Sequence, residues 1–83
     1  MDLKEQFEDA QNRVKTLPAQ PPNVLLELYG LFKQANNGDA TGSRPGMFDM
    51  RGRAKYDAWH SNQGMSSDEA MQAYIQKVSD LGA

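Results

Sequence analysis

Apolar residues at intervals of three and four positions are the feature that most constrains the fold of this chain. Near the start they are Leu3, Phe7, Ala10, Val14 and Leu17, and near the end Met71, Tyr74, Val78 and Leu81. Such spacing places apolar side chains on one face of an α-helix. We therefore predict an all-α fold without strands.

Prolines separate the first two predicted helices, because proline cannot continue a helix. They are Pro18, Pro21 and Pro22. The first helix is expected over residues 3–16, and Asp2 with Glu5 is a capping pair at its start. The second is expected over residues 23–36, where asparagine and glycine allow the left-handed conformation that ends a helix.

Residues 37–50 form a long connection with no apolar period. Loops of this length in small domains are usually functional or cross over the fold. Three residues near its end, Met47, Phe48 and Met50, are too apolar for a free linker. We therefore expect the connection to pack against the helices through these side chains.

Two more helices are expected after this connection. One covers residues 51–60, with its inward positions at Ala54, Ala58 and Trp59. The other follows Ser66, which forms a capping box with Glu69. Short links favour antiparallel neighbours, whereas the long connection lets the second and third helices run parallel. We expect residues 1–83 to form one domain, an up-down-down-up four-helix bundle with a long crossover between its second and third helices.

The size and charge of the chain argue against several classes of protein. It has 83 residues, no cysteine and a net charge of −2, which argues against nucleic-acid binding. No apolar run is long enough for stable membrane insertion. The charged N-terminal segment lacks the features of a signal peptide, so a cytoplasmic location is expected. Residues 44–55 nevertheless carry a local net charge of +3.

Few residues are available for catalysis or metal binding. His60 is the only histidine, and Asp57 lies three residues before it, which favours a surface pair over a general base. A segment that begins at Asp39 starts like a calcium-binding loop, but Arg44 replaces the required glycine and Met50 the required glutamate. We therefore expect no enzymatic activity, no bound metal and no cofactor.

The segment LYGLFKQA, residues 28–35, belongs to two stripes of side chains at helical spacing. The first stripe, which we assign to packing, contains Leu25, Leu28, Phe32 and Ala35, and the second contains Leu26, Tyr29 and Lys33. On the predicted third helix, Lys55 lies four residues before Trp59. Each of these helices therefore pairs a lysine with an aromatic residue at i, i+4 spacing.

These lysine–aromatic pairs have more than one interpretation. A single pair more often reflects packing of a lysine stem along the surface. If the two helices are parallel neighbours, both lysines lie beside rings, which suits a ligand with a phosphate and a flat base, such as a nucleotide. A helical module that binds an acidic protein is the main alternative. A membrane-surface helix is less favoured, because the first helix is acidic.

Several linked motifs resemble the acyl-CoA-binding protein family in order and spacing. They are LYGLFKQA (28–35), GD (38–39), RPGMFD (44–49), GRAKYDAW (52–59) and DEAMQAYI (68–75). The resemblance implies a cytosolic, monomeric four-helix bundle that binds medium- and long-chain fatty acyl-CoA esters without catalysing a reaction. It also implies that the protein shields these esters and carries them to acyl-CoA-using enzymes, which it contacts transiently.

The resemblance further implies which residues contact the head group of the ligand. Tyr29, Lys33 and Lys55 correspond to the family's contacts with the 3′-phosphate and its surroundings. Lys15, which follows Val14, is similar to a further family lysine.

Aromatic and apolar contacts are implied in the same way. Phe32 and Tyr74 correspond to aromatic contacts around the adenine and the bound ester. Leu25 and Leu26 are expected beside the acyl tail. The sequence departs from the family pattern at Phe32, where tyrosine is usual, and at Tyr56, where tryptophan is common.

Overall fold

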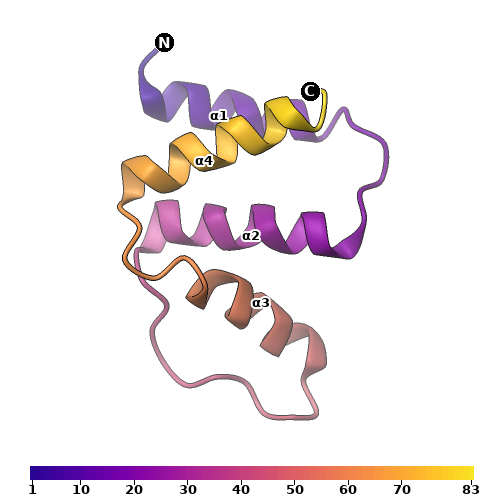
Figure 1. Cartoon of the computed structure of the whole chain (residues 1–83), viewed down its shortest axis with the longest axis vertical. Coiled ribbons are helices and arrows are strands. Elements are labelled where there is room, and N and C mark those ends of the chain that lie inside the picture. The colour runs from indigo at the N-terminus through magenta and orange to yellow at the C-terminus, as the bar shows by residue number, and fades with distance from the viewer.

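The computed structural model describes residues 1–83 and contains four helices and no strands. The helices are α1 (Leu3–Val14), α2 (Pro22–Asn37), α3 (Met50–His60) and α4 (Ser67–Asp80). In Figure 1, α1 and α4 run in one direction, and α2 and α3 run in the other. The predicted up-down-down-up bundle with a long α2–α3 crossover is therefore confirmed. None of the helices has the length and apolar character needed to cross a membrane.

The ends of the helices follow the capping residues seen in the sequence. The side chain of Asp2 accepts a hydrogen bond from the amide of Glu5 at 2.8 Å. Ser66 and Glu69 form the predicted capping box, in which each side chain accepts from the backbone amide of the other. α1 ends two residues earlier than expected, because the amides from Lys15 onward bond to carbonyls three residues back and form tighter turns.

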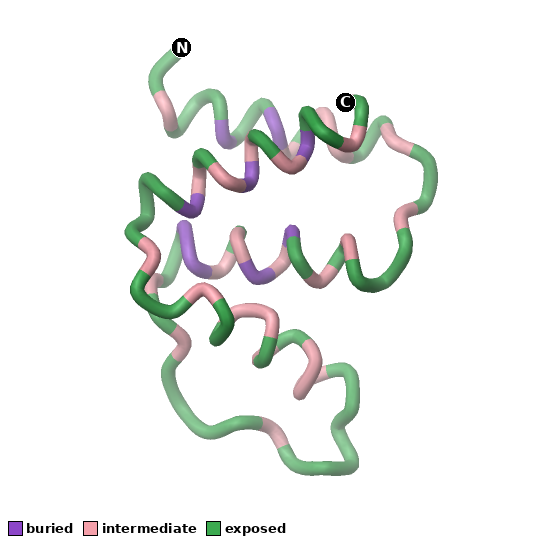
Figure 2. The backbone as a smooth tube through the Cα atoms, in the orientation of Figure 1, coloured by how far each residue is buried: buried purple, intermediate pink, exposed green.

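The four helices form a row in the order α1, α4, α2, α3 (Figure 1). The Cα trace measures 40 × 28 × 15 Å, so the molecule is thin in one dimension. The buried core lies where α1, α4 and α2 meet, as the purple segments of Figure 2 show. It contains Phe7, Ala10, Leu28, Ala35, Ala70, Tyr74 and Val78.

This arrangement leaves two sets of predicted inward positions only partly buried. α3 packs against α2 alone, so Ala54, Ala58 and Trp59 are half-buried and no residue of α3 is fully buried. Of the α2 stripe assigned to packing, Leu28 and Ala35 are buried, whereas Leu25 and Phe32 are 53% and 36% exposed. Neighbouring helices only partly cover that side of α2.

The crossover between α2 and α3 is held by polar contacts, and the prediction that its apolar residues pack against the helices is wrong. The indole of Trp59 donates to the carbonyl of Gly38 at 2.7 Å, and the hydroxyl of Tyr56 donates to the carbonyl of Gly42 at 3.1 Å. The guanidinium of Arg44 donates two hydrogen bonds to the carboxylate of the α3 residue Asp57. Met47, Phe48 and Met50 are instead exposed.

The expected surface pair between Asp57 and His60 is also absent. Both carboxylate oxygens of Asp57 accept from Arg44, at 2.9 and 2.6 Å. The His60 ring stacks on Tyr56, with 6.0 Å between the ring centroids. A bidentate pair with arginine has better geometry than a carboxylate–imidazole contact three residues along one helix.

Candidate functional site

The parallel course of α2 and α3 brings lysines and aromatic rings together across the two helices. The ammonium of Lys55 lies 5.3 Å from the centroid of the Tyr29 ring. One turn further along both helices, the ammonium of Lys33 lies 4.7 Å from the ring of Trp59. The sequence predicted pairs within each helix, namely Tyr29 with Lys33 and Lys55 with Trp59. The partners are exchanged because each lysine stem reaches over the ring of the neighbouring helix.

The register between α2 and α3 is set by close packing at Gly30. A Cβ atom added at this glycine would overlap the carbonyl oxygen of Ala58. Glycine therefore allows the two backbones to approach closely at this point. This approach holds Tyr29, just before Gly30, at the level of Lys55.

The polar groups of this site have no partners within the chain. Neither the hydroxyl of Tyr29 nor the ammonium groups of Lys33 and Lys55 make a hydrogen bond or an ion pair, although both lysines lie over rings. By contrast, Lys77 is paired with Glu27 at 2.9 Å. The α2–α3 junction thus presents two free cations and a free phenol, a set of donors suited to phosphate oxygens.

A groove of about 560 Å³ adjoins these donors, between the first halves of α2 and α3. Its lining residues are Pro22, Leu25, Leu26, Met50, Arg51, Ala54 and Lys55. Leu25 and Leu26 therefore share one groove with Lys55, and this volume lies within the range of small-molecule sites. The arrangement has a cationic end and an apolar trough. It is therefore complementary to an amphiphile with an anionic head.

Phe32 and Tyr74 both contact the ring of Phe7, so the structure joins them through the core. Tyr74 meets Phe7 edge-to-face with 5.1 Å between centroids, and Phe32 meets it at 6.3 Å. Tyr74 is buried, and this burial raises the pKa of its phenol. Its hydroxyl makes no hydrogen bond within the chain, yet is not fully enclosed. Phe32 is partly exposed to solvent.

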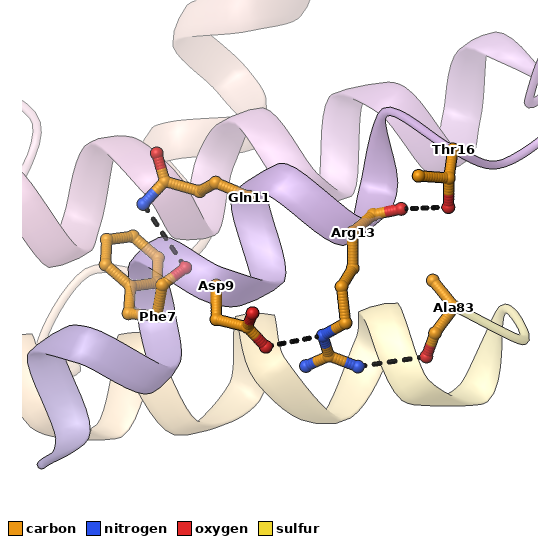
Figure 3. Close-up of polar contacts among 6 residues, drawn as sticks. All are labelled: Phe7, Asp9, Gln11, Arg13, Thr16 and Ala83. Atoms are coloured by element: carbon orange, nitrogen blue, oxygen red, sulfur yellow. Dashed lines mark hydrogen bonds and ion pairs between the residues drawn. The ribbon is translucent and has the colours of Figure 1, made fainter. Parts of the chain in front are cut away.

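Lys15 lies apart from the other candidate residues, at the end of α1. Figure 3 shows that Arg13 points toward the end of α4, where its guanidinium donates to the Ala83 carbonyl at 2.9 Å and also to Asp9. Lys15 follows the last residue of α1, is exposed, and makes no side-chain hydrogen bond or ion pair within the chain.

The sequence analysis missed part of the site. Met50, Arg51 and Ala54 line the groove, and Trp59 holds Lys33 rather than Lys55. The expected parallel course of the two helices was the one sequence signal that could have indicated these contacts between them. Sequence spacing alone does not give the register between two helices, which here depends on the contact of Gly30 with Ala58.

Comparisons with known proteins find relatives in sequence and in structure. The sequence model of a family described as acyl-CoA-binding protein matches residues 4–78. An acyl-CoA-binding protein of Brassica napus is 57% identical over 82 residues, covering 98% of this chain and 89% of the relative. An acyl-CoA-binding protein homolog of Manduca sexta is 52% identical over 83 residues, covering 98% of this chain and 92% of the relative.

A solved structure leads to the same family. The crystal structure of Oryza sativa acyl-CoA-binding protein 2 superposes with a TM-score of 0.92 at 46% sequence identity, covering 96% of this chain and 90% of that chain. A small helical ligand-binding protein is the class that the fold and the groove define. The chain belongs to the acyl-CoA-binding protein family.

Proposed function

We propose that this chain binds medium- and long-chain fatty acyl-CoA esters, shields them and carries them through the cytoplasm to the enzymes that use them. It does so as a monomer, with residues 1–83 as one binding domain and without catalysing a reaction. Contact with the receiving enzymes is transient. Membership of the family and the names of its relatives support acyl-CoA as the ligand.

The observation that carries this proposal is the position of Lys55, which belongs both to the cationic cluster and to the apolar groove. Its ammonium lies over Tyr29, while its stem lines the groove together with Leu25 and Leu26. A ligand that binds here meets free cations at one end and apolar side chains at the other. An acyl-CoA ester has this distribution of phosphate and hydrocarbon.

Each candidate residue has a role in the proposed complex. Lys33, Lys55 and the Tyr29 hydroxyl bind phosphate oxygens of the head group, and Lys15 reaches the ligand from the end of α1. The exposed part of the Phe32 ring stacks on the adenine. The hydroxyl end of Tyr74 approaches the ester from the core.

Titration calorimetry with free CoA and a series of esters tests the proposal. Each methylene buried in the groove contributes up to about 0.8 kcal/mol, so affinity should rise with chain length. Going from a twelve-carbon to a sixteen-carbon ester gives a ceiling of about 3 kcal/mol, which is lowered by ordering of the tail. The rise should level off at the end of the groove.

A flat series, with CoA bound as tightly as its long-chain esters, would overturn the acyl-CoA proposal. It would favour the alternative in which the lysine–aromatic cluster binds an acidic protein.

A further inference from the structure

Three large apolar side chains at the end of the crossover are exposed to solvent. Met47, Phe48 and Met50, which we call the apolar tip, are 70%, 97% and 79% exposed. They lie where the crossover enters α3, at the end of the molecule opposite α1 and α4, and Figure 2 shows this segment as exposed. Clustered apolar exposure of this kind usually marks an interaction surface.

The crossover does not need the apolar tip for its own attachment. Trp59, Tyr56 and Asp57 of α3 hold it through the contacts with Gly38, Gly42 and Arg44 described above. The carboxylate of Asp49, next to Phe48, accepts from the amide of Gly52 at 2.9 Å and caps α3. A fixed backbone therefore presents these side chains outward.

Free positive charge follows the apolar tip in α3. Arg51, Arg53 and Lys55 follow it directly in α3, and none of them forms an ion pair. Residues 44–55 carry +3, while the whole chain carries −2, so the remaining residues carry −5. Such a charge separation turns the tip toward an anionic surface and the rest of the molecule away from it.

We propose that the apolar tip and its arginines dock on the surface of an anionic phospholipid bilayer. Phe48 and the two methionines enter the boundary between head groups and acyl chains, and Arg51 and Arg53 contact lipid phosphates. A fluid bilayer accepts projecting side chains without a matching cavity, whereas a folded partner must supply one. The tip is an outward-facing loop end, so the lipid surface fits it best.

Docking in this orientation has a consequence that rests on the proposed function. Met50 belongs to the tip and also lines the groove, together with Arg51, Leu25 and Leu26. One end of the groove then faces the bilayer. An acyl chain leaving the membrane enters the groove without crossing open water.

Vesicle co-sedimentation of the full chain without acyl-CoA tests the docking. We expect binding to vesicles that contain phosphatidylserine, weaker binding to pure phosphatidylcholine, and release at high salt. Phe48→Ser should lower the partition coefficient several-fold, and Arg51→Gln about five-fold. Lys4→Gln, which removes one exposed cation from α1, is the matched control and should change it less than two-fold.

Equal binding to both kinds of vesicle, or a Phe48→Ser variant that partitions like the parent, would overturn the docking proposal. Absence of vesicle binding would do the same, and a concentration-dependent dimer lost in Phe48→Ser would then identify a second copy as the occupant. Calorimetry separates this result from the proposed function, because Phe48→Ser lies outside the groove and should bind acyl-CoA like the parent.

Discussion

Two lysines without ion-pair partners define the candidate site at the scale of single residues. Each ammonium lies over a ring, which contributes about 0.5–1 kcal/mol at exposed positions and holds the lysine stem in place. The cations at positions 33 and 55 are thus oriented before any ligand arrives. Less side-chain entropy is lost on binding as a result.

The first prediction concerns these two charges. Lys33→Met and Lys55→Met keep the apolar stem over Trp59 and Tyr29 but remove the ammonium. Loss of a charge-assisted hydrogen bond to phosphate should weaken acyl-CoA binding by about 1.5–3 kcal/mol, or about 10- to 150-fold, in each variant. Calorimetry at low salt measures this directly.

Lys4→Met is the control for this series, because Lys4 is exposed on α1 and has no partner. Its affinity should match the parent. If both site variants also bind like the parent while retaining their helical circular dichroism, the head group does not contact these lysines.

The sequence allowed the residues of this site to be predicted better than their contacts. Lys33, Lys55 and Tyr29 were predicted from their spacing along the helices and from the family resemblance. The structure brings all three to the junction of α2 and α3. Their ring partners were predicted wrongly, because a lysine stem reaches a ring on its own helix or on the next one equally well. Only the tertiary register decides between the two.

At the scale of helices, the site depends on how closely α2 and α3 approach. Gly30→Ala places a methyl group against the Ala58 carbonyl, and a backbone atom cannot move away as a flexible side chain would. We predict a free energy of unfolding lower by about 1–3 kcal/mol, even though alanine favours the helix by up to about 1 kcal/mol. Acyl-CoA affinity should fall as well, because the groove lies between the two helices. Urea denaturation and calorimetry measure the two effects.

Gly46→Ala is the matched control, since an added Cβ there meets no atom within 4 Å and the residue is outside the left-handed region. It should leave stability and binding within experimental error of the parent. A Gly30→Ala variant that behaves like Gly46→Ala would show that α3 can shift without loss of the site.

The crossover illustrates which elements were difficult to predict. Its length and its lack of period were evident in the sequence, and so was its role as a connection between parallel helices. The packing of the crossover was not evident, because apolar residues normally indicate burial. Here polar contacts attach the crossover, and its apolar residues stay exposed. The bond from Trp59 to Gly38 joins residues 21 positions apart, and no local pattern encodes it.

At the scale of the whole molecule, the loop lengths allowed the up-down-down-up directions of the helices to be predicted. They did not predict that the helices form a row. Periodicity predicted the apolar faces of α1 and α4, both of which contribute to the core. α3 lacks a fully buried face and packs on α2 alone. Polar contacts therefore have a larger role in stabilising this half of the molecule.

Several of these polar contacts use carboxylates and make the stability of the molecule sensitive to acid. Hydrogen bonds from the Gly64 amide and the Gln34 side chain hold the pKa of Asp39 below its ordinary value of 3.8. Arg44 lowers the pKa of Asp57 in the same way. The backbone amide of Ser66 lowers the pKa of Glu69 below 4.5.

We predict that the free energy of unfolding is nearly constant between about pH 5 and pH 9 and falls progressively below about pH 4. Each of these carboxylates has a lower pKa in the folded chain, so the unfolded chain takes up protons first as the pH falls. Their contribution is therefore fully present above the unfolded pKa and is lost as the pH falls through the folded pKa. Urea denaturation followed by circular dichroism across this range gives the curve.

Asp39→Asn tests whether one of these carboxylates has the assigned role. Both hydrogen bonds to Asp39 end on the same oxygen, Oδ1, which asparagine can retain while losing the ionisable group. The variant should be less stable than the parent near neutral pH and should lose less stability on acidification, so the two curves converge as the pH falls. Glu8→Gln removes an α1 carboxylate that has no partner, and its curve should follow the parent. If Asp39→Asn stays a constant interval below the parent down to about pH 3, the charge of Asp39 does not stabilise its contacts with Gln34 of α2 and with Gly64.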